Sequence, residues 1–258
     1  MTQLAEKTIQ KIQAIADIVR NTKKGVVLTG AGSSTPSGIS DFRSTKSGLW
    51  QRYDPLEVAS LLSFRYHPEK FYNWMRPLAK EIYSAQPNPA HVAISALEEL
   101  GHIKSVITQN IDGLHQRAGS KNVIEVHGTI KTMTCVNCFR QQQSADIIED
   151  YLENGNVPLC PFCHNILKPD VVLFGEQLPV KAWLQAVKVV KECDLILVAG
   201  SSLEVMPAAN LPMQAIEQGA HLIIINHSHT YLDTRADLVM WEDVATILPA
   251  IVQAITNP

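Results

Sequence analysis

The sequence predicts an α/β fold built on a doubly wound parallel sheet, with a smaller inserted domain that contains helices and a zinc ribbon. Short buried strands alternate with helical patterns, and polar loops follow the ends of those strands. Two stretches interrupt the alternation: residues 44–88 are rich in aromatic residues, and residues 129–170 hold four paired cysteines. We therefore expect a Rossmann-like domain from 1–43, 89–128 and 171–258, with both interruptions in the small domain.

The elements of the sheet follow in order along the chain. Apolar residues at helical spacing predict an opening helix over residues 9–19. Buried strands are expected at 25–29, 106–108, 194–199 and 222–225, and helical patterns lie near 90–100, 180–192, 207–219 and 244–255. Because ligands bind at the carboxyl ends of strands in such sheets, we expect the polar residues that follow these strands to converge on one crevice.

The bulk composition bounds the partners and the compartment. The 258 residues carry 46% hydrophobic and 18% charged side chains, which is ordinary for a globular protein. The net charge of −3 gives no general electrostatic case for nucleic acid or an anionic membrane as a partner. No apolar signal-peptide core and no run of about 18 apolar residues stands out, so we expect a cytoplasmic protein. No pattern indicates the oligomeric state.

Four cysteines form two close pairs. Cys135 and Cys138 make one CxxC unit, Cys160 and Cys163 make the other, and 21 residues lie between the two units. This spacing is close to that of zinc ribbons, and four thiolates leave no position for water, so the predicted metal is structural. Two redox dithiols or unrelated core cysteines are the alternatives. Cys193 stands alone and is interpreted as a small core residue.

Glycines follow the first predicted strand. Gly30 and Gly32 suggest a backbone that approaches a phosphate, although a glycine pair is also typical of a simple tight turn. Thr35 stands where a dehydrogenase fingerprint would have its third glycine, and no ribose-binding acid ends a second strand, which disfavours a hydride-transfer enzyme. Asp41-Phe42-Arg43 is interpreted either as a mobile flap over a ligand or as a loop with one buried anchor and a surface ion pair.

Taken together, the motifs resemble those of the sirtuin family from about residue 10 to 255. In chain order they are Gly30-Ala-Gly-Ser-Ser-Thr-Pro-Ser-Gly-Ile-Ser-Asp-Phe-Arg43, Thr108-Gln-Asn-Ile-Asp-Gly-Leu-His115, Glu125-Val-His-Gly128, the two CxxC pairs, Phe174-Gly-Glu176, Gly200-Ser-Ser-Leu203 with Pro207, and Ile225-Asn226. The resemblance implies NAD-dependent removal of acetyl or other apolar acyl groups from protein lysines, giving nicotinamide and O-acyl-ADP-ribose. It also implies NAD as a consumed co-substrate, one structural Zn²⁺, and acylated-lysine proteins or peptides as substrates.

The resemblance assigns roles to individual residues. His127 would be the general base, and Asn110 and Asp112 would act beside it, although Asn110 and His115 could instead satisfy backbone groups of their loop. The residues expected to bind NAD are Gly30, Ala31, Gly32, Thr35, Asp41, Phe42, Arg43, Gln109, Asn110, Ile111, Asp112, Gly200, Ser201, Ser202, Asn226 and Val244. Those expected to bind the substrate are Val172, Leu173, Phe174, Gly175, Glu176, Leu203, Glu204 and Val205.

The sequence departs from the family pattern at a few positions. Ser33 replaces a more frequent apolar branched residue, and Ser40 replaces a frequent proline, which predicts a looser flap. Sirtuins that favour acidic acyl groups carry a Tyr-x-x-Arg pair, whereas here Tyr72 is followed by Arg76 one place late, which favours acetyl or apolar acyl groups over succinyl. Two other functions stay open: ADP-ribosyl transfer to protein, and a non-catalytic NAD or zinc interaction module.

Overall fold

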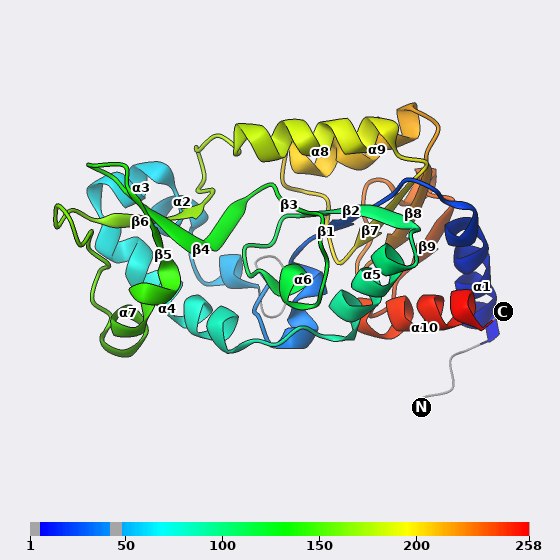
Figure 1. Ribbon diagram of the computed structural model, residues 1–258, viewed down its shortest axis with the longest axis horizontal. Helices are drawn as coiled ribbons and strands as arrows, with labels where there is room; N and C mark the ends of the chain where they lie inside the picture. The colour runs from blue at the N-terminus through cyan, green and yellow to red at the C-terminus, as the bar shows by residue number, and fades with distance from the viewer. Residues whose placement is uncertain (1–5, 42–47, 258) are drawn as a thin grey trace.

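The computed structural model describes residues 6–41 and 48–257. Within these ranges the larger part of the molecule is a six-stranded parallel sheet with strand order β3-β2-β1-β7-β8-β9 (Figure 1). The strands are β1 (Gly25–Thr29), β2 (Ile103–Thr108), β3 (Val123–Glu125), β7 (Leu195–Ala199), β8 (His221–Ile225) and β9 (Leu238–Met240). The chain builds outward from β1 first on one side and then on the other, so the order reverses between β1 and β7. This is the doubly wound arrangement that the sequence predicted.

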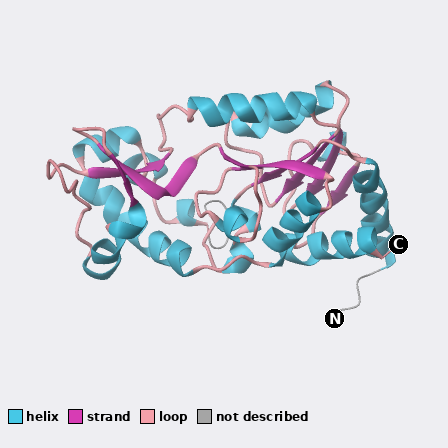
Figure 2. Cartoon of the chain, viewed as in Figure 1, coloured by secondary structure: helices cyan, strands magenta, loops and turns pink. Residues whose placement is uncertain are grey.

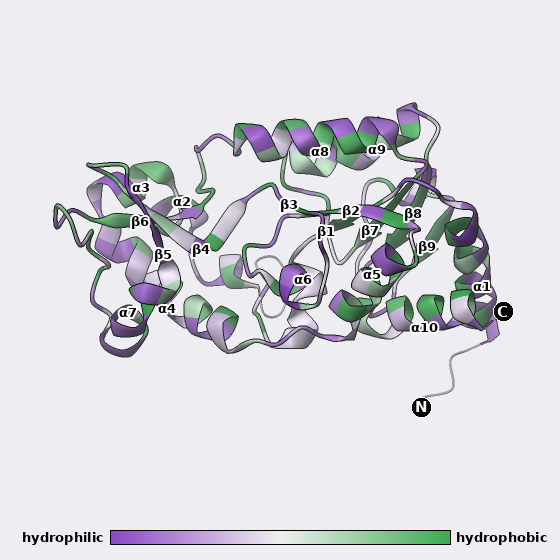
Figure 3. Cartoon of the chain, viewed as in Figure 1, coloured by the Kyte–Doolittle hydropathy of each residue, from purple (hydrophilic) through white to green (hydrophobic). Residues whose placement is uncertain are grey.

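Helices cover both faces of this sheet (Figure 1). One face packs against α1 (Glu6–Asn21), α5 (Pro89–Glu99) and α10 (Val244–Thr256), and the other packs against α8 (Val180–Glu192) and α9 (Leu211–Glu217). Val27 belongs to the first cluster, whereas its neighbours Val26 and Leu28 belong to the second, because consecutive strand residues point to opposite faces. Figure 3 shows hydrophilic and hydrophobic residues alternating along α8, as expected for a helix with one face on the sheet.

The smaller part is built around a three-stranded antiparallel sheet of order β5-β4-β6, with helices around it (Figure 2). Its elements are α2 (Pro55–Val58), α3 (Leu61–Tyr66), α4 (Pro68–Ser84), β4 (Gly128–Cys135), β5 (Gln141–Gln143), α7 (Ile148–Asn154) and β6 (Leu167–Val171). Tyr72 of α4 and Tyr151 of α7 lie in one hydrophobic cluster, and the Tyr151 hydroxyl donates to the Tyr72 carbonyl oxygen at 2.5 Å. Both interruptions therefore share one core. The exact domain boundaries stay a prediction.

The differences from the expected elements lie mostly at the sheet edges. The edge strands β3 and β9 have three residues each and were not predicted, because so short a segment carries little periodic signal. Strand β2 begins at Ile103, three residues before the expected start. The single helix expected near 207–219 is a 3₁₀ turn, Ala208–Asn210, followed by α9. None of the helices in the described ranges combines the length and apolar content that a membrane span would need.

Candidate active site

A cleft of about 1780 Å³ opens at the carboxyl ends of the sheet strands, where the large and small parts meet. Its walls come from the loops after β1, β2, β7 and β8, from the segment after β6, and from the helical insert. This is the edge at which the strand order reverses between β1 and β7. Ligands of doubly wound sheets bind at this position, so the cleft is the candidate active site.

The floor of the cleft is made by two backbone segments that lie in direct contact. The Gly32 N–H donates to the Gly200 carbonyl oxygen at 2.9 Å. Gly200 has a φ of +64°, and a Cβ placed there would lie 2.3 Å from the Ser33 nitrogen; a Cβ on Gly32 would lie 2.9 Å from the Gly200 oxygen. Only glycine fits at these positions. The resulting cradle brings bare backbone to the cleft, which suits a dinucleotide phosphate.

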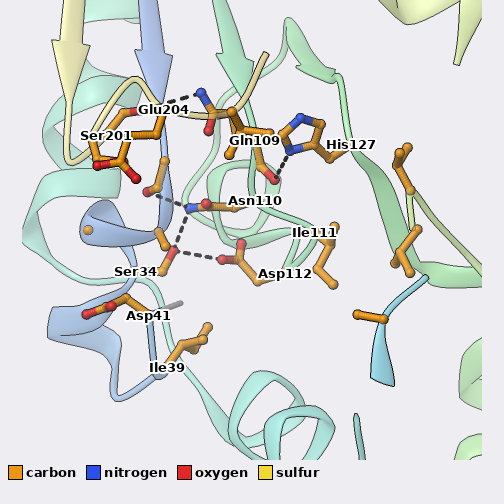
Figure 4. Close-up of a pocket in the computed structure, with 18 of the residues that line it drawn as sticks. Ser34, Ile39, Asp41, Gln109, Asn110, Ile111, Asp112, His127, Ser201 and Glu204 are labelled. Atoms are coloured by element: carbon orange, nitrogen blue, oxygen red, sulfur yellow. Dashed lines mark hydrogen bonds between the residues drawn. The ribbon is translucent and has the colours of Figure 1, made fainter. Parts of the chain in front are cut away.

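Asn110 and Asp112 follow β2 and are held by the loop that follows β1 (Figure 4). The Asn110 side-chain amide donates to the Gly30 carbonyl oxygen and to Ser34 Oγ, both at 3.0 Å. Ser34 Oγ donates to Asp112 Oδ2 at 2.7 Å, and Asp112 Oδ1 accepts from the Leu114 N–H at 2.9 Å. Asn110 therefore satisfies a backbone group, as one of the two sequence interpretations held, while both residues still line the cleft.

Ser33 and Ser40, the two serines that depart from the family pattern, both make hydrogen bonds. Ser33 is fully buried, and its hydroxyl donates to the Gly30 carbonyl oxygen at 2.8 Å. The Ser40 N–H donates to Glu81 Oε2 at 2.8 Å, and the Ser40 hydroxyl donates to Oε1 at 3.1 Å. Ser40 thus ties its loop to α4. Phe42 and Arg43, both expected to bind NAD, lie outside the described residues.

His127 lies between β3 and β4 and lines the cleft. Its Nδ1 is 3.2 Å from the Gln109 carbonyl oxygen (Figure 4). A carbonyl oxygen only accepts, so Nδ1 carries the proton of the neutral ring. Nε2 is then the basic nitrogen, as a general base requires.

The segment 172–176 forms another wall of the cleft, with backbone contacts on both sides. The Val172 N–H donates to the His127 carbonyl oxygen at 2.9 Å, which joins this segment to the start of β4. The Phe174 N–H donates to the Ala59 carbonyl oxygen, also at 2.9 Å, which joins it to the helical insert. At its turn, Glu176 Oε2 accepts from the Leu173 N–H and pairs with Lys168 Nζ, each at 3.0 Å.

Most of the residues predicted to bind NAD or substrate meet at this one cleft. The described residues among them that line it are Gly30, Ala31, Gly32, Thr35, Asp41, Gln109, Asn110, Ile111, Asp112, Val172, Leu173, Phe174, Gly175, Glu176, Gly200, Ser201, Ser202, Glu204, Val205 and Asn226. Leu203 and Val244 do not line it. Leu203 is 3% exposed in the cluster under α9, and Val244 is 4% exposed in the cluster under α10.

An apolar part of the cleft, called the apolar pocket below, was not assigned from the sequence. Its lining residues come from the loop after β1 and from α4: Ile39, Phe71, Trp74, Met75, Leu78 and Ile82. Trp50 stacks on Trp74 with ring centroids 5.5 Å apart, and meets Phe174 edge-on at 5.9 Å. The aromatic richness of residues 44–88 was the available signal, but only the packing of α4 shows which aromatic rings face the cleft.

Tyr72 and Arg76 point away from that pocket. The Tyr72 hydroxyl donates to the Leu167 carbonyl oxygen, and the Arg76 guanidinium donates to the Leu152 carbonyl oxygen at 3.1 Å. Neither residue is among the lining residues of the cleft. The apolar pocket therefore receives neither the phenol nor the guanidinium that would accompany an acidic acyl group.

The four paired cysteines come together at the far end of the small part. Their sulfur atoms all lie within 4.8 Å of one another, with Cys135 Sγ 3.4 Å from Cys163 Sγ and Cys138 Sγ 3.7 Å from Cys160 Sγ. Thiolates around a tetrahedral zinc lie about 3.7 Å apart, given Zn–S bonds of about 2.3 Å. The two CxxC turns share one geometry, because the residue after each second cysteine has a positive φ, 59° at 139 and 57° at 164. The donor set fits one structural zinc ion, as predicted.

Two buried histidines lie behind the loop that follows β2. Desolvation lowers the pKa of His115 to about 3, assisted by the nearby His91 ring. Desolvation also lowers the pKa of His91 to about 4, against the opposing effect of Asp112. Both rings are therefore neutral in the folded protein at physiological pH.

These shifts predict an acid-sensitive fold. The histidines of the unfolded chain take up protons below about pH 6.5, whereas the folded ones do not, so the free energy of unfolding should fall as pH drops from about 6.5 toward 4. Each histidine should contribute at most about 1.4 kcal/mol per pH unit, and this limit applies well below pH 6.5. Urea unfolding at pH 7, 6 and 5 checks this, and His115→Gln should flatten the dependence. An unchanged slope in that variant would contradict the prediction.

Comparison with known proteins agrees with this geometry. The family model described as "Sir2 family" matches residues 30–207. NAD-dependent protein deacylase 2 of Archaeoglobus fulgidus is 43% identical over 246 residues, covering 95% of this chain and 96% of the relative. A solved structure from work on the mechanism and regulation of Sir2 enzymes has a TM-score of 0.90 at 42% identity, covering 96% of this chain and 98% of the other.

A third similar protein was solved with a ligand. The structure of Sir2Af2 bound to a myristoylated histone peptide has a TM-score of 0.83 at 38% identity, covering 96% of this chain and 97% of that one. The family match spans more than half of the described chain, and the relatives align over nearly its full length. The chain belongs to the Sir2 family.

Proposed function

We propose that the protein removes acetyl or other apolar acyl groups from protein lysines and consumes NAD in doing so, giving nicotinamide and O-acyl-ADP-ribose. The single observation that carries this proposal is the composition of the cleft. One continuous space joins a glycine cradle, a histidine whose Nδ1 is held by a carbonyl oxygen and an apolar pocket. An enzyme that brings a dinucleotide and an acylated side chain together needs these three parts.

The residues present fit NAD. The cradle of Gly30, Gly32 and Gly200 would receive the phosphates, and Ser201 and Asn226 line the cleft beyond it, at the ends of β7 and β8. When bound, NAD supplies a ribose carbon whose bond to nicotinamide can break. We assign the adenosine half to the β7–β8 side, because the apolar pocket is lined mainly by α4 of the small part.

The loop after β2 would hold the nicotinamide half. Asp112 is buried, and its carboxylate is positioned by Ser34 and by the Leu114 N–H, so it can accept from the carboxamide amine. Ile111 and Ile39 place apolar surface on the same part of the cleft and exclude water from a developing positive charge. His127 Nε2 would take a proton from a ribose hydroxyl.

The acylated lysine would enter as part of an extended peptide. Residues 172–176 and 204–206 both line the cleft, and a substrate strand between two such segments is a common recognition mode. The lysine side chain would then reach toward Phe71, Met75 and Leu78 of α4. No Lys or Arg among the described residues lines this cleft, so an acidic acyl group would be buried without a partner, at a cost of several kcal/mol. Sir2Af2, with its myristoylated peptide, supports an apolar preference.

A mass-spectrometric assay of purified protein tests the proposal. Acetyl-, myristoyl- and succinyl-lysine peptides of one sequence would be incubated with and without NAD. We expect NAD-dependent loss of acetyl and myristoyl groups with equal release of nicotinamide, and at least about tenfold slower loss of succinyl. Comparable succinyl turnover would contradict the assignment of an apolar pocket.

The same assay addresses the two other functions. An ADP-ribosyltransferase would leave labelled ADP-ribose on protein, whereas a deacylase releases it as the O-acyl product. A non-catalytic module would bind NAD without releasing nicotinamide. We further propose a cytoplasmic location, because four thiols gathered around one metal position suit a reducing compartment. Cell fractionation with an antibody against the protein tests that location.

A further inference from the structure

His91 and His115 form a closely packed pair that no step of the proposed reaction uses. His91 belongs to α5 and is 0% exposed; His115 belongs to α6 (Leu114–Arg117) and is 1% exposed. Their ring centroids are 4.8 Å apart, with an angle of 66° between the ring planes. His91 Nε2 and His115 Nδ1 are both buried without a hydrogen-bond partner among the described residues. Buried polar atoms normally have hydrogen-bond partners, so two neighbouring nitrogens without one require a physical explanation.

The hydrogen bonds around His91 identify its tautomer. The Asn88 N–H donates to His91 Nδ1 at 3.3 Å, so Nδ1 is the bare, accepting nitrogen. The proton of the neutral ring is therefore on Nε2. His91 Nε2, the atom without a partner, is thus a donor.

The hydrogen bonds around His115 show that its unpartnered nitrogen is an acceptor. Its Nε2 lies 2.9 Å from Thr29 Oγ1, whose own hydrogen goes to Thr108 Oγ1, also at 2.9 Å. Thr108 Oγ1 in turn accepts from the Asn110 N–H at 3.0 Å. With the Thr29 hydrogen so engaged, His115 Nε2 must carry the proton and donate to Thr29. His115 Nδ1, the other atom without a partner, is therefore an acceptor.

We propose that His91 and His115 are positioning residues that form one neutral hydrogen-bond chain, in which His91 Nε2–H donates to His115 Nδ1 directly or through one buried water. The chain begins at the Asn88 N–H and ends at the Asn110 N–H. All its groups are satisfied once the two nitrogens meet, which removes the penalty of an unpaired buried donor and acceptor. The low pKa of each ring, caused by burial, keeps both rings in the neutral form that this chain needs.

Each end of the chain lies next to a loop that lines the cleft. The Asn88 side-chain amide donates to the Ser33 carbonyl oxygen and to Ser37 Oγ, both at 2.9 Å, in the loop after β1. The other end holds the backbone of Asn110, in the loop after β2. The pair therefore sets the distance between the two loops that, under the proposed function on which this inference rests, enclose the nicotinamide ribose. Neither histidine lines the cleft itself.

Variants of His115 test the chain by separating its hydrogen bonds from its bulk. His115→Phe keeps a ring but has no nitrogen, whereas His115→Gln can still donate to Thr29 and accept from His91. We expect His115→Phe to raise the KM for NAD about tenfold, with kcat and the KM for acetyl-peptide within twofold of wild type. His115→Gln should restore the KM for NAD. His221→Gln, at the amino end of β8, is the matched control and should change nothing.

The tautomers themselves are measurable without turnover. In ¹⁵N-histidine NMR spectra at pH 7, both rings should show a protonated Nε2 and a bare Nδ1. NAD affinity by calorimetry should follow the same order as the KM values. Because calorimetry needs no turnover, it tests the histidine pair even if the protein shows no deacylase activity. Should His115→Phe not fold, Thr108→Val breaks the other end of the chain without loss of volume and should weaken NAD binding similarly. A protonated Nδ1 on His115, or unchanged NAD affinity in both His115→Phe and Thr108→Val, would overturn the proposal.

Discussion

Replacing His127 with alanine should lower the kcat for deacylation by roughly 10²–10⁴-fold while leaving NAD affinity within about twofold. The reason is the position of the ring: Nδ1 is held by the Gln109 carbonyl oxygen at 3.2 Å, so the basic Nε2 is the nitrogen left to take a proton in the cleft. The glycine cradle is made by other segments and should persist. Product formation by mass spectrometry and NAD binding by calorimetry measure the two effects separately.

A second substitution distinguishes proton transfer from positioning. His127→Gln can still donate to the Gln109 carbonyl oxygen but has no basic nitrogen, so it should lose as much turnover as His127→Ala. His102→Ala, just before β2 and at the amino end of the sheet, is the matched control and should retain wild-type turnover. Wild-type rates in His127→Ala would show that another group is the base.

Removal of the metal should unfold the small part of the molecule and thereby abolish activity. Cys135 and Cys160 are fully buried in the hydrophobic cluster that also holds Phe71 and Tyr72 of α4. Binding of a structural zinc ion contributes about 10–16 kcal/mol in zinc-finger peptides, which is comparable to the whole stability of a domain. Chelation or Cys160→Ala should therefore change the fluorescence of Trp50 and Trp74 and expose α4 to proteolysis.

Cys193 provides the control for this experiment. It is buried at the C-terminal end of α8 in a different cluster, so Cys193→Ala removes one thiol without removing a ligand. We expect that variant to retain one zinc ion per chain by elemental analysis and to keep its activity. Full folding and activity of the chelated wild type would contradict the structural zinc site.

The sequence predicted those site residues whose motif is contiguous in the chain. Strand-end motifs such as Gly30 to Gly32 and Gln109 to Asp112 are contiguous, and parallel strands bring their carboxyl ends to one edge. Their convergence could therefore be predicted and is confirmed in one cleft. Leu203 and Val244 were assigned through the family resemblance, but packing with the helices on the two faces of the sheet places their side chains in the core instead.

The sequence by itself determined the α/β class, the central strands, the cysteine quartet and the family, because each depends on residues close together in the chain or at a definite spacing. Only the tertiary structure decided which rings of α4 line the apolar pocket and where Tyr72 and Arg76 point. It also brought the rings of His91 and His115 into contact. These features depend on contacts between segments far apart in the chain, such as Tyr72 with Leu167, and no local periodicity encodes such contacts.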